Sequence, residues 1–266
     1  MTGHVSLGKK FRPKLPNPSA TTYPSPCRLR YDETASAATH GNPAWQIEAQ
    51  GKSMDARTLK EQHRQVRDGQ PEALRMRIHR AISWLARAEQ EKEDQDARYI
   101  FLWIAFNAAY ASEFGFEQKE RDQVRQFIDR LLRLDGEQRL HDALFHQFSG
   151  PIRTLIDNRF VFEPFWRAMR NHESDGAWET SFAASRKLAL RALMEKDTAT
   201  LLSILLDRLY VLRNQLIHGS ATWGGTTNRA QVKEGAAILG VLLPNVIDLM
   251  MRGGEDDFGY IAYPVV

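Results

Sequence analysis

Residues 198–219 read TATLLSILLDRLYVLRNQLIHG, and this stretch decides the fold. Its leucines recur every three or four residues, the spacing that places side chains on one face of an α-helix. Glycine at position 219 is a residue at which helices commonly end. The stretch therefore predicts a helix from Thr198 to His218 with one buried face, formed by Leu202, Leu205, Leu209, Leu212 and Leu216.

The same helical spacing recurs on both sides of this stretch. Residues 98–110, RYIFLWIAFNAAY, are apolar almost all round and predict a buried central helix. A last helix is predicted from Ala230 to Met251, bent at Pro244. Shorter patterns predict further helices after Pro71, around 124–132, from 140 to a stop at Gly150-Pro151, and over 185–193. Strand signals are missing apart from one short strand expected at 260–263. The predicted fold class is therefore all-α, and an antiparallel helical bundle is the natural architecture.

Composition divides the chain into three parts. Residues 1–53 hold six of the 11 prolines, and seven lysines and arginines against three acids. No helical or strand period occurs there, so we expect a disordered basic leader. Residues 54–252 form the predicted helical domain, and 253–266 form a C-terminal tail. Because the chain beyond the leader holds 29 basic and 30 acidic residues, a nucleic-acid site there has to be a local cluster.

Composition and missing motifs exclude several classes of protein. A single cysteine, Cys27, excludes a disulfide framework and a Cys-rich zinc site, and suits a reducing compartment. The longest apolar stretch, 99–111, is too short to span a bilayer, and no secretory signal opens the sequence. We therefore expect a cytoplasmic protein with no membrane contact. The glycine-rich phosphate loop, HExxH, CxxC and GxSxG do not occur, so no metal or cofactor is predicted.

Polar side chains gather where the leucine-rich helix ends. Arg213 and His218 are five residues apart, about 140° around the helix, so they flank one edge of its end. Backbone carbonyls at a helix C-terminus favour a protonated imidazole. One interpretation is that His218 and Gly219 cap the helix while Arg213 pairs with an acid. The other is that Arg213, Asn214 and His218 form a site for proton transfer and anion binding.

The segment resembles the signature of the HEPN superfamily, in which four to six residues stand between an arginine and a following histidine. Four such pairs occur, of which only the last has asparagine after the arginine, a leucine-rich helix before it and glycine after the histidine: Arg57/His63, Arg139/His146, Arg167/His172 and Arg213/His218. With the aromatic helix at 101–110, the chain is similar to the larger, Apea-like HEPN proteins over about residues 72–250. Residues 115–180 would then be an elaboration of a minimal HEPN bundle.

This resemblance implies a metal-independent endoribonuclease that cuts single-stranded RNA as a homodimer, with two Arg/His motifs lining one cleft. His218 would act as base or acid, Arg213 would contact phosphoryl oxygens, and Asn214 would orient either one. Such proteins act as toxins or in defence against phage, some under an antitoxin or other regulatory protein. Ser220 stands where HepT-type toxins carry a modified tyrosine, so that form of control is not expected.

Other candidates carry a second interpretation each. Asn107 either faces the cleft and contacts RNA or makes a buried structural hydrogen bond. Arg208, Arg229 and Lys233 lie near the motif in sequence and either contact RNA phosphates or are ordinary solvated charges. The aromatic residues of the 98–110 segment are expected in the core. Two competing classes remain: a non-catalytic HEPN module that binds RNA or a protein partner, and a helical scaffold unrelated to HEPN.

Overall fold

The computed structural model describes residues 54–110, 117–226, 228–253 and 258, with the side chains of 117–123 left out. All the described helices lie in one compact unit. The predicted leader at 1–53 and the predicted strand at 260–263 lie outside the described residues, as does most of the C-terminal tail.

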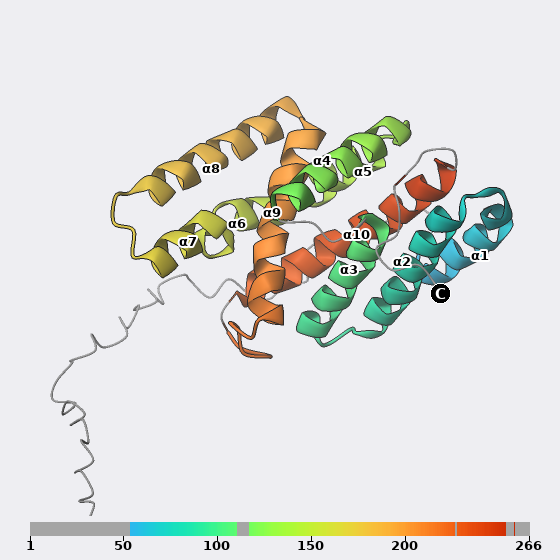
Figure 1. Cartoon of the computed structure of the whole chain (residues 1–266), viewed down its shortest axis with the longest axis horizontal. Helices are drawn as coiled ribbons and strands as arrows, with labels where there is room; N and C mark the ends of the chain where they lie inside the picture. Colours follow the sequence, from blue (N-terminus) through green and yellow to red (C-terminus); the bar gives the residue numbers. More distant parts are fainter. Residues whose placement is uncertain (1–53, 111–116, 227, 254–257, 259–266) are drawn as a thin grey trace, which may run out of the picture. The chain divides into compact units, whose positions relative to one another are not determined.

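The described residues contain helices and turns but no strand, which confirms the predicted all-α class (Figure 1). The α-helices are α1 (Ala56–Val66), α2 (Glu72–Gln90), α3 (Gln95–Tyr110), α4 (Glu117–Leu134), α5 (Arg139–Asp142), α6 (Ser149–Ile156), α7 (Glu163–Asn171), α8 (Ala177–Glu195), α9 (Thr198–Ile217) and α10 (Arg229–Arg252). Three short segments, η2 (Arg67–Gly69), η3 (Ala143–Gln147) and η4 (Arg159–Val161), connect some of them. The helices predicted around 98–110, 198–218 and 230–251 are α3, α9 and α10.

Helix α3 lies at the centre of the bundle, as its apolar sequence predicts. It packs mainly against α2 and α10, and also against α9. The hydroxyl of the fully buried Tyr99 donates a hydrogen bond to the carbonyl of Leu209, with the two oxygens 2.6 Å apart. Gly235 lets α10 approach this contact, because a Cβ atom there would lie only 2.8 Å from the Tyr99 ring. Helices α3, α9 and α10 therefore pack closely against one another around Tyr99.

Helix α10 is also a core helix, although its sequence is apolar enough for another role. Its length and composition alone would allow it to cross a membrane. However, 78% of its most apolar window is buried inside the protein, where α10 packs against α3, α2 and α1. Pro244, near the middle of the helix, is itself buried. The apolar character of α10 is therefore explained by the core.

One predicted helix boundary is wrong. The pattern around residues 140–148 predicts a helix that stops at Gly150-Pro151, but α5 passes into the π-helical turn η3 and a new helix, α6, begins at Ser149. Proline is tolerated in the first turn of a helix, because the backbone N–H that it lacks would have no intrahelical partner there. The Gly-Pro pair therefore opens a helix here instead of ending one.

Helix α9 lies between two groups of elements (Figure 1). On one side it contacts α3 and α10, and on the other it contacts α8, α6 and η4, with α7 packed against α8. The segment from α4 to α7, predicted as an elaboration, thus covers a side of α9 that α3 leaves open. This arrangement places the end of α9 between two parts of the bundle.

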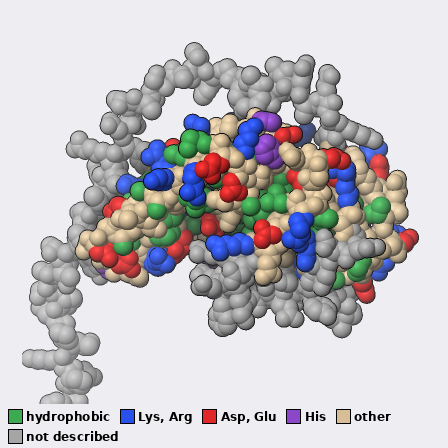
Figure 2. Space-filling model, turned by 90° about the horizontal axis from the view of Figure 1, so that it is seen from above, with side chains coloured by type: hydrophobic (Ala, Val, Ile, Leu, Met, Phe, Trp, Pro, Cys, Tyr) green, Lys and Arg blue, Asp and Glu red, His purple; other side chains and the backbone are tan. Residues whose placement is uncertain are grey.

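Charges on the surface are mixed. On the face seen in Figure 2, basic and acidic side chains alternate over short distances, in agreement with the nearly balanced charge beyond residue 53. The described side chains of this face form no large basic surface, so a site for an anion among them has to be local.

Candidate functional site

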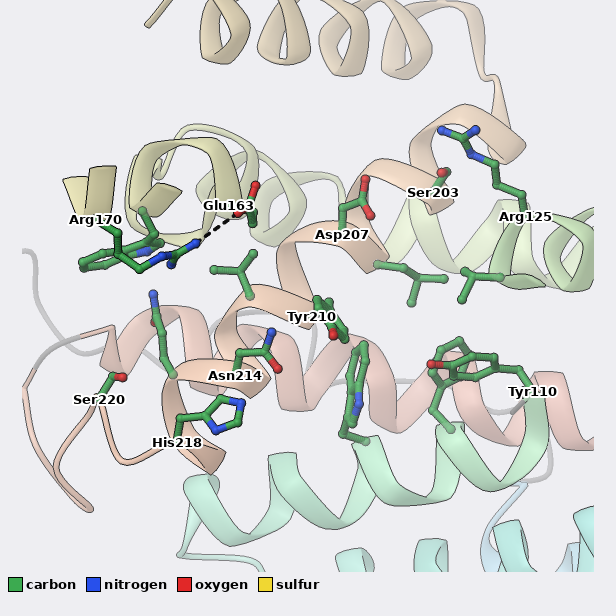
Figure 3. A pocket seen from close by; sticks show the side chains of 17 residues that line it. Tyr110, Arg125, Glu163, Arg170, Ser203, Asp207, Tyr210, Asn214, His218 and Ser220 are labelled. Atoms are coloured by element: carbon green, nitrogen blue, oxygen red, sulfur yellow. Dashed lines mark hydrogen bonds and ion pairs between the residues drawn. The ribbon is translucent and has the colours of Figure 1, made fainter. Parts of the chain in front are cut away.

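One face of α9 lines a cavity of about 550 Å³ (Figure 3). The residues that α9 contributes recur every three or four positions, so they lie on one side of the helix: Ser203, Leu206, Asp207, Tyr210, Val211, Asn214, Gln215 and His218. Other helices and the loop after α9 complete the wall with Trp103, Phe106, Tyr110, Val124, Arg125, Glu163, Trp166, Arg170 and Ser220. The cavity thus brings Asn214 and His218 together with residues from α3, α4 and α7.

His218 stands at the end of α9 with an exposed side chain. Its backbone N–H donates to the carbonyl of Asn214 at 3.0 Å, and Gly219 follows with a φ of +66°, a conformation that glycine adopts without strain. The N–H groups of Ser220 and Ala221 both donate to the carbonyl of Gln215. These contacts confirm the predicted helix stop and leave the imidazole accessible at the cavity wall.

The loop that follows His218 is tied to the start of α3. The carboxylate of the buried Asp96 accepts two hydrogen bonds from Arg229, at 3.0 and 2.9 Å, and a third from the backbone N–H of Gly224. Its neighbour Asp94 accepts a hydrogen bond from the indole of Trp223 at 2.8 Å. These charge-assisted bonds hold the loop in place. Arg229, predicted as an RNA contact, is already engaged in this anchor.

Gln215 connects the same loop to η4. Its side-chain amide donates to the carbonyl of Phe160 and accepts a hydrogen bond from Asn228, whose side-chain nitrogen lies 2.7 Å from Gln215 Oε1. Gln215 is nearly buried and lines the cavity. The end of α9 is therefore fixed both to the start of α10 and to the segment that carries α7.

Arg213 contacts the cavity wall through its neighbour. Its Nη1 donates to Oδ1 of Asn214 at 2.8 Å, while its buried Nε has no hydrogen-bond partner among the described residues. Within that part of the chain Arg213 forms no ion pair with an acid, contrary to the interpretation in which it simply pairs with one. Burial raises the pKa of Tyr99 well above its ordinary value, and the nearby Arg213 guanidinium opposes that rise.

Arg208 corrects one prediction. Only 2% of this residue is exposed, and its guanidinium donates to Ser185 while lying 4.3 Å from the ring centre of Phe162 and 5.6 Å from that of Phe182. Burial lowers its pKa to about 10. A guanidinium covered in this way is not accessible to a phosphate, so the predicted RNA contact of Arg208 does not fit the structure. The residue instead joins α8 and the segment before α7 to α9.

Two further candidates lie away from the cavity wall. Asn107 does not line the cavity, and its buried Oδ1 has no hydrogen-bond partner among the residues described. Neither of the two interpretations of this amide is therefore established. Lys233 is exposed on α10 and lies outside the lining. Asn214 and His218 are thus the predicted site residues that the structure brings together, with Arg213 bonded to one of them.

Several other residues that share this cavity were not predicted from the sequence. Tyr210 stands four positions before Asn214 and eight before His218, so helical spacing alone could have placed it on the same face. Trp166, Glu163 and Arg170 come from α7, and the pair Glu163 and Arg170 makes a 3.4 Å contact (Figure 3). No local pattern links α7 to α9, so their shared site follows only from tertiary packing.

The cavity wall carries two arginines and two acids, Arg125, Arg170, Glu163 and Asp207, so a donor for an anion has to come from local polar groups such as Asn214 and His218. Among the described residues no group of three or more histidines, cysteines and acids could hold a metal ion.

Searches against protein families, curated proteins and solved structures found no match. The HEPN resemblance therefore stays a prediction from the sequence, and a function has to be argued from the site itself.

Proposed function

We propose that the protein is a metal-independent endoribonuclease that cuts single-stranded RNA, with His218 as a proton-transfer group. The observation that carries this proposal is an exposed imidazole on a fixed helix end, in the wall of a cavity that also contains the amide of Asn214. Histidine is the side chain whose ordinary pKa lies closest to neutrality, which suits it to serve as base or acid.

The reaction needs no co-reactant. The 2′-oxygen of a ribose attacks the adjacent phosphorus, a P–O2′ bond forms and the P–O5′ bond breaks. A base takes the proton of the 2′-hydroxyl, and an acid gives a proton to the leaving 5′-oxygen. The products are a 2′,3′-cyclic phosphate and a 5′-hydroxyl, and deoxyribose lacks the attacking group.

We assign anion binding to Asn214 and a positioning role to Arg213. Asn214 precedes His218 by four residues, so the two side chains are neighbours on one helix face. Because Oδ1 of Asn214 accepts from Arg213, the amide turns its NH2 group away from the guanidinium. That NH2 group is the donor we assign to a phosphoryl oxygen. Arg213 thus acts through Asn214, whereas the sequence suggested direct phosphate contact.

A second copy of the chain would supply the second proton-transfer group. Each chain has one His218, while the reaction asks for both a base and an acid. Two apolar side chains close to this histidine in the sequence are exposed: Ile217, which precedes it, to 47%, and Trp223, in the loop that follows it, to 75%. Exposed apolar groups beside a site favour an interface, and a two-fold dimer would bring two copies of His218 to one cleft.

The biological role that goes with this activity is an RNA-degrading toxin or anti-phage effector in the cytoplasm. Uncontrolled cleavage of RNA would harm the cell that makes the enzyme. A regulatory partner, such as an antitoxin protein, therefore belongs to the proposal.

The test compares wild type, His218→Ala and the control His79→Ala with single-stranded RNA in EDTA. His79 is exposed on α2 and lies outside the cavity lining. We expect wild type and His79→Ala to cut the RNA and His218→Ala to leave it intact. Binding of RNA by all three proteins without cleavage would instead identify a non-catalytic module. If the three proteins neither bind nor cut the RNA, the remaining class is a helical scaffold.

A further inference from the structure

Aromatic rings line the cavity beside His218 from two sides, several from α3 and α9 and Trp166 from α7. On the α3 and α9 side, Trp103 lies 6.1 Å from Tyr210 and 5.7 Å from Phe106, measured between ring centres. On the α7 side, Trp166 lies 5.1 Å from Phe165 and 6.3 Å from Phe160. Trp103, Phe106, Tyr210 and Trp166 all contribute to the same cavity wall. An open volume is therefore bordered by aromatic surface from two directions.

The α7 side is held in place relative to α9. The indole N–H of Trp166 donates to the carbonyl of Phe160 at 2.8 Å, and the side chain of Gln215 donates to that same carbonyl. One carbonyl thus joins the Trp166 ring to the helix that carries His218. A wall that is already ordered loses little conformational freedom when a ligand binds.

Polar groups lie at both ends of the aromatic part. Figure 3 shows His218, Asn214, Ser220 and the Glu163–Arg170 pair towards one end of the cavity, and Ser203 and Arg125 towards the other, with Asp207 between the two groups. The ligand that matches this pattern has a flat ring in the middle and an anionic group on the His218 side. A nucleobase with its phosphate has that form, and 550 Å³ falls within the usual range for a small-molecule site.

We propose that this cavity binds one unpaired nucleobase of the RNA, against the rings of Tyr210 and Trp166, next to the phosphate held at His218. This inference rests on the proposed function and names its substrate: a nucleotide turned out of the base stack. Aromatic side chains bind unstacked bases in single strands, whereas a base inside a duplex cannot reach such a cavity without leaving its stack. A single strand is therefore bound and a duplex is excluded.

The test measures binding without cleavage, by calorimetry with adenosine 5′-monophosphate and with ribose 5-phosphate. Both probes carry the same phosphate and only the first carries a base. We expect the nucleotide to bind at least about tenfold more tightly than the sugar phosphate, the effect of one stacked base. Tyr210→Ala and Trp166→Ala should each weaken nucleotide binding about five- to tenfold, while Tyr210→Phe and Trp166→Phe keep most of it.

The control variant is Trp84→Ala. Trp84 is partly exposed and stacks on Phe101 outside the cavity lining, so its removal should leave nucleotide binding unchanged. Circular dichroism and thermal unfolding identify any variant that fails to fold, and the phenylalanine variants then carry the comparison.

Equal binding of the two probes, no binding of the nucleotide at millimolar concentration, or insensitivity to both alanine variants overturns the base site. The outcome is separate from that of the proposed function. Nucleotide binding that depends on Tyr210 in a protein that never cuts RNA supports the base site and refutes the nuclease. If the protein cuts RNA but its nucleotide binding does not depend on Tyr210, the nuclease is supported and the base site is refuted.

Discussion

Arg213 and Asn214 are adjacent in the sequence, and their side chains are joined by a 2.8 Å hydrogen bond from Nη1 to Oδ1. Arg213 does not line the cavity, whereas Asn214 does. The contact therefore links a half-buried cation to the polar wall beside His218, and it sets which end of the amide faces Arg213. This relationship determines how we divide the roles of the two residues.

The first prediction concerns that division. Asn214→Ala should lower the rate of RNA cleavage roughly 100-fold, because it removes a donor assigned to the phosphoryl group. Arg213→Ala should lower it by a similar factor, and the double variant should be little worse than either single variant. Single-turnover cleavage rates of the three proteins provide the measurement. If the loss of rate in the double variant equals the product of the two single losses, Arg213 acts independently of Asn214.

A second prediction concerns the loop after His218. Asp96→Asn should destabilise the protein by about 1–3 kcal/mol, since it weakens the two charge-assisted bonds to the partly exposed Arg229. Cleavage by the variant should also slow, because the loop holding the end of α9 is loosened. Urea unfolding gives the free energy. Asp94→Asn is the matched control: it weakens the contact to Trp223, while asparagine still accepts the backbone N–H of Ala97 at the start of α3, so it should cost less than about 1 kcal/mol.

Much of the fold could be predicted from the sequence. The spacing of leucines such as Leu209 and Leu216 places α9, and Gly219 marks its end, because these signals depend on a few neighbouring residues. The boundary at Gly150-Pro151 could not be predicted in the same way. Gly-Pro is compatible with both the end and the start of a helix, and the π-helical turn before it has no clear signal in the sequence.

The site could be predicted only in part. Asn214 and His218 share a helix face, so their proximity follows from spacing alone. The environment of Arg208 could not be foreseen, because Phe162 and Phe182 come from other segments and cover its guanidinium only in the folded chain. The same holds for Trp166, which reaches the cavity from α7.

A third prediction tests the central packing of the bundle. Gly235→Ala would place a Cβ atom 2.8 Å from Cε2 of Tyr99 and 3.0 Å from Cδ2 of Leu209. We expect a loss of about 1–3 kcal/mol despite the better helix propensity of alanine. Gly150→Ala in α6 is the control, since a Cβ there meets no atom within 4 Å. Thermal unfolding of both variants decides the point, and equal stability would show that α3 and α10 do not approach as closely as described.

A fourth prediction concerns pH and Glu234. Burial raises the pKa of this carboxyl group to about 7, and its Oε2 has no hydrogen-bond partner among the residues described. Between about pH 4.5 and 7, the folded protein therefore holds a proton on Glu234 that the unfolded chain, with a pKa near 4.5, has already released. The free energy of unfolding should accordingly fall as the pH rises from about 4.5 to 7 and then level off.

Glu234→Gln removes this ionisation, so the decrease should become shallower. At pH 8 the variant should be more stable than wild type by about 1 kcal/mol, a value that allows for solvent around a partly exposed group. Urea unfolding at pH 5 and pH 8 provides the comparison. An unchanged difference between the two pH values in the variant would exclude Glu234 as its source.

The central claim is that His218 moves protons while a 2′-hydroxyl attacks the adjacent phosphate. Mass spectrometry of the fragments from one oligonucleotide sequence, supplied as RNA and as DNA in EDTA, tests this most directly. We expect wild type to convert the RNA to fragments ending in 2′,3′-cyclic phosphate and beginning with 5′-hydroxyl, while the DNA and all reactions of His218→Ala remain uncut. Fragments with 3′-hydroxyl and 5′-phosphate ends, or equal cleavage by His218→Ala, would contradict it.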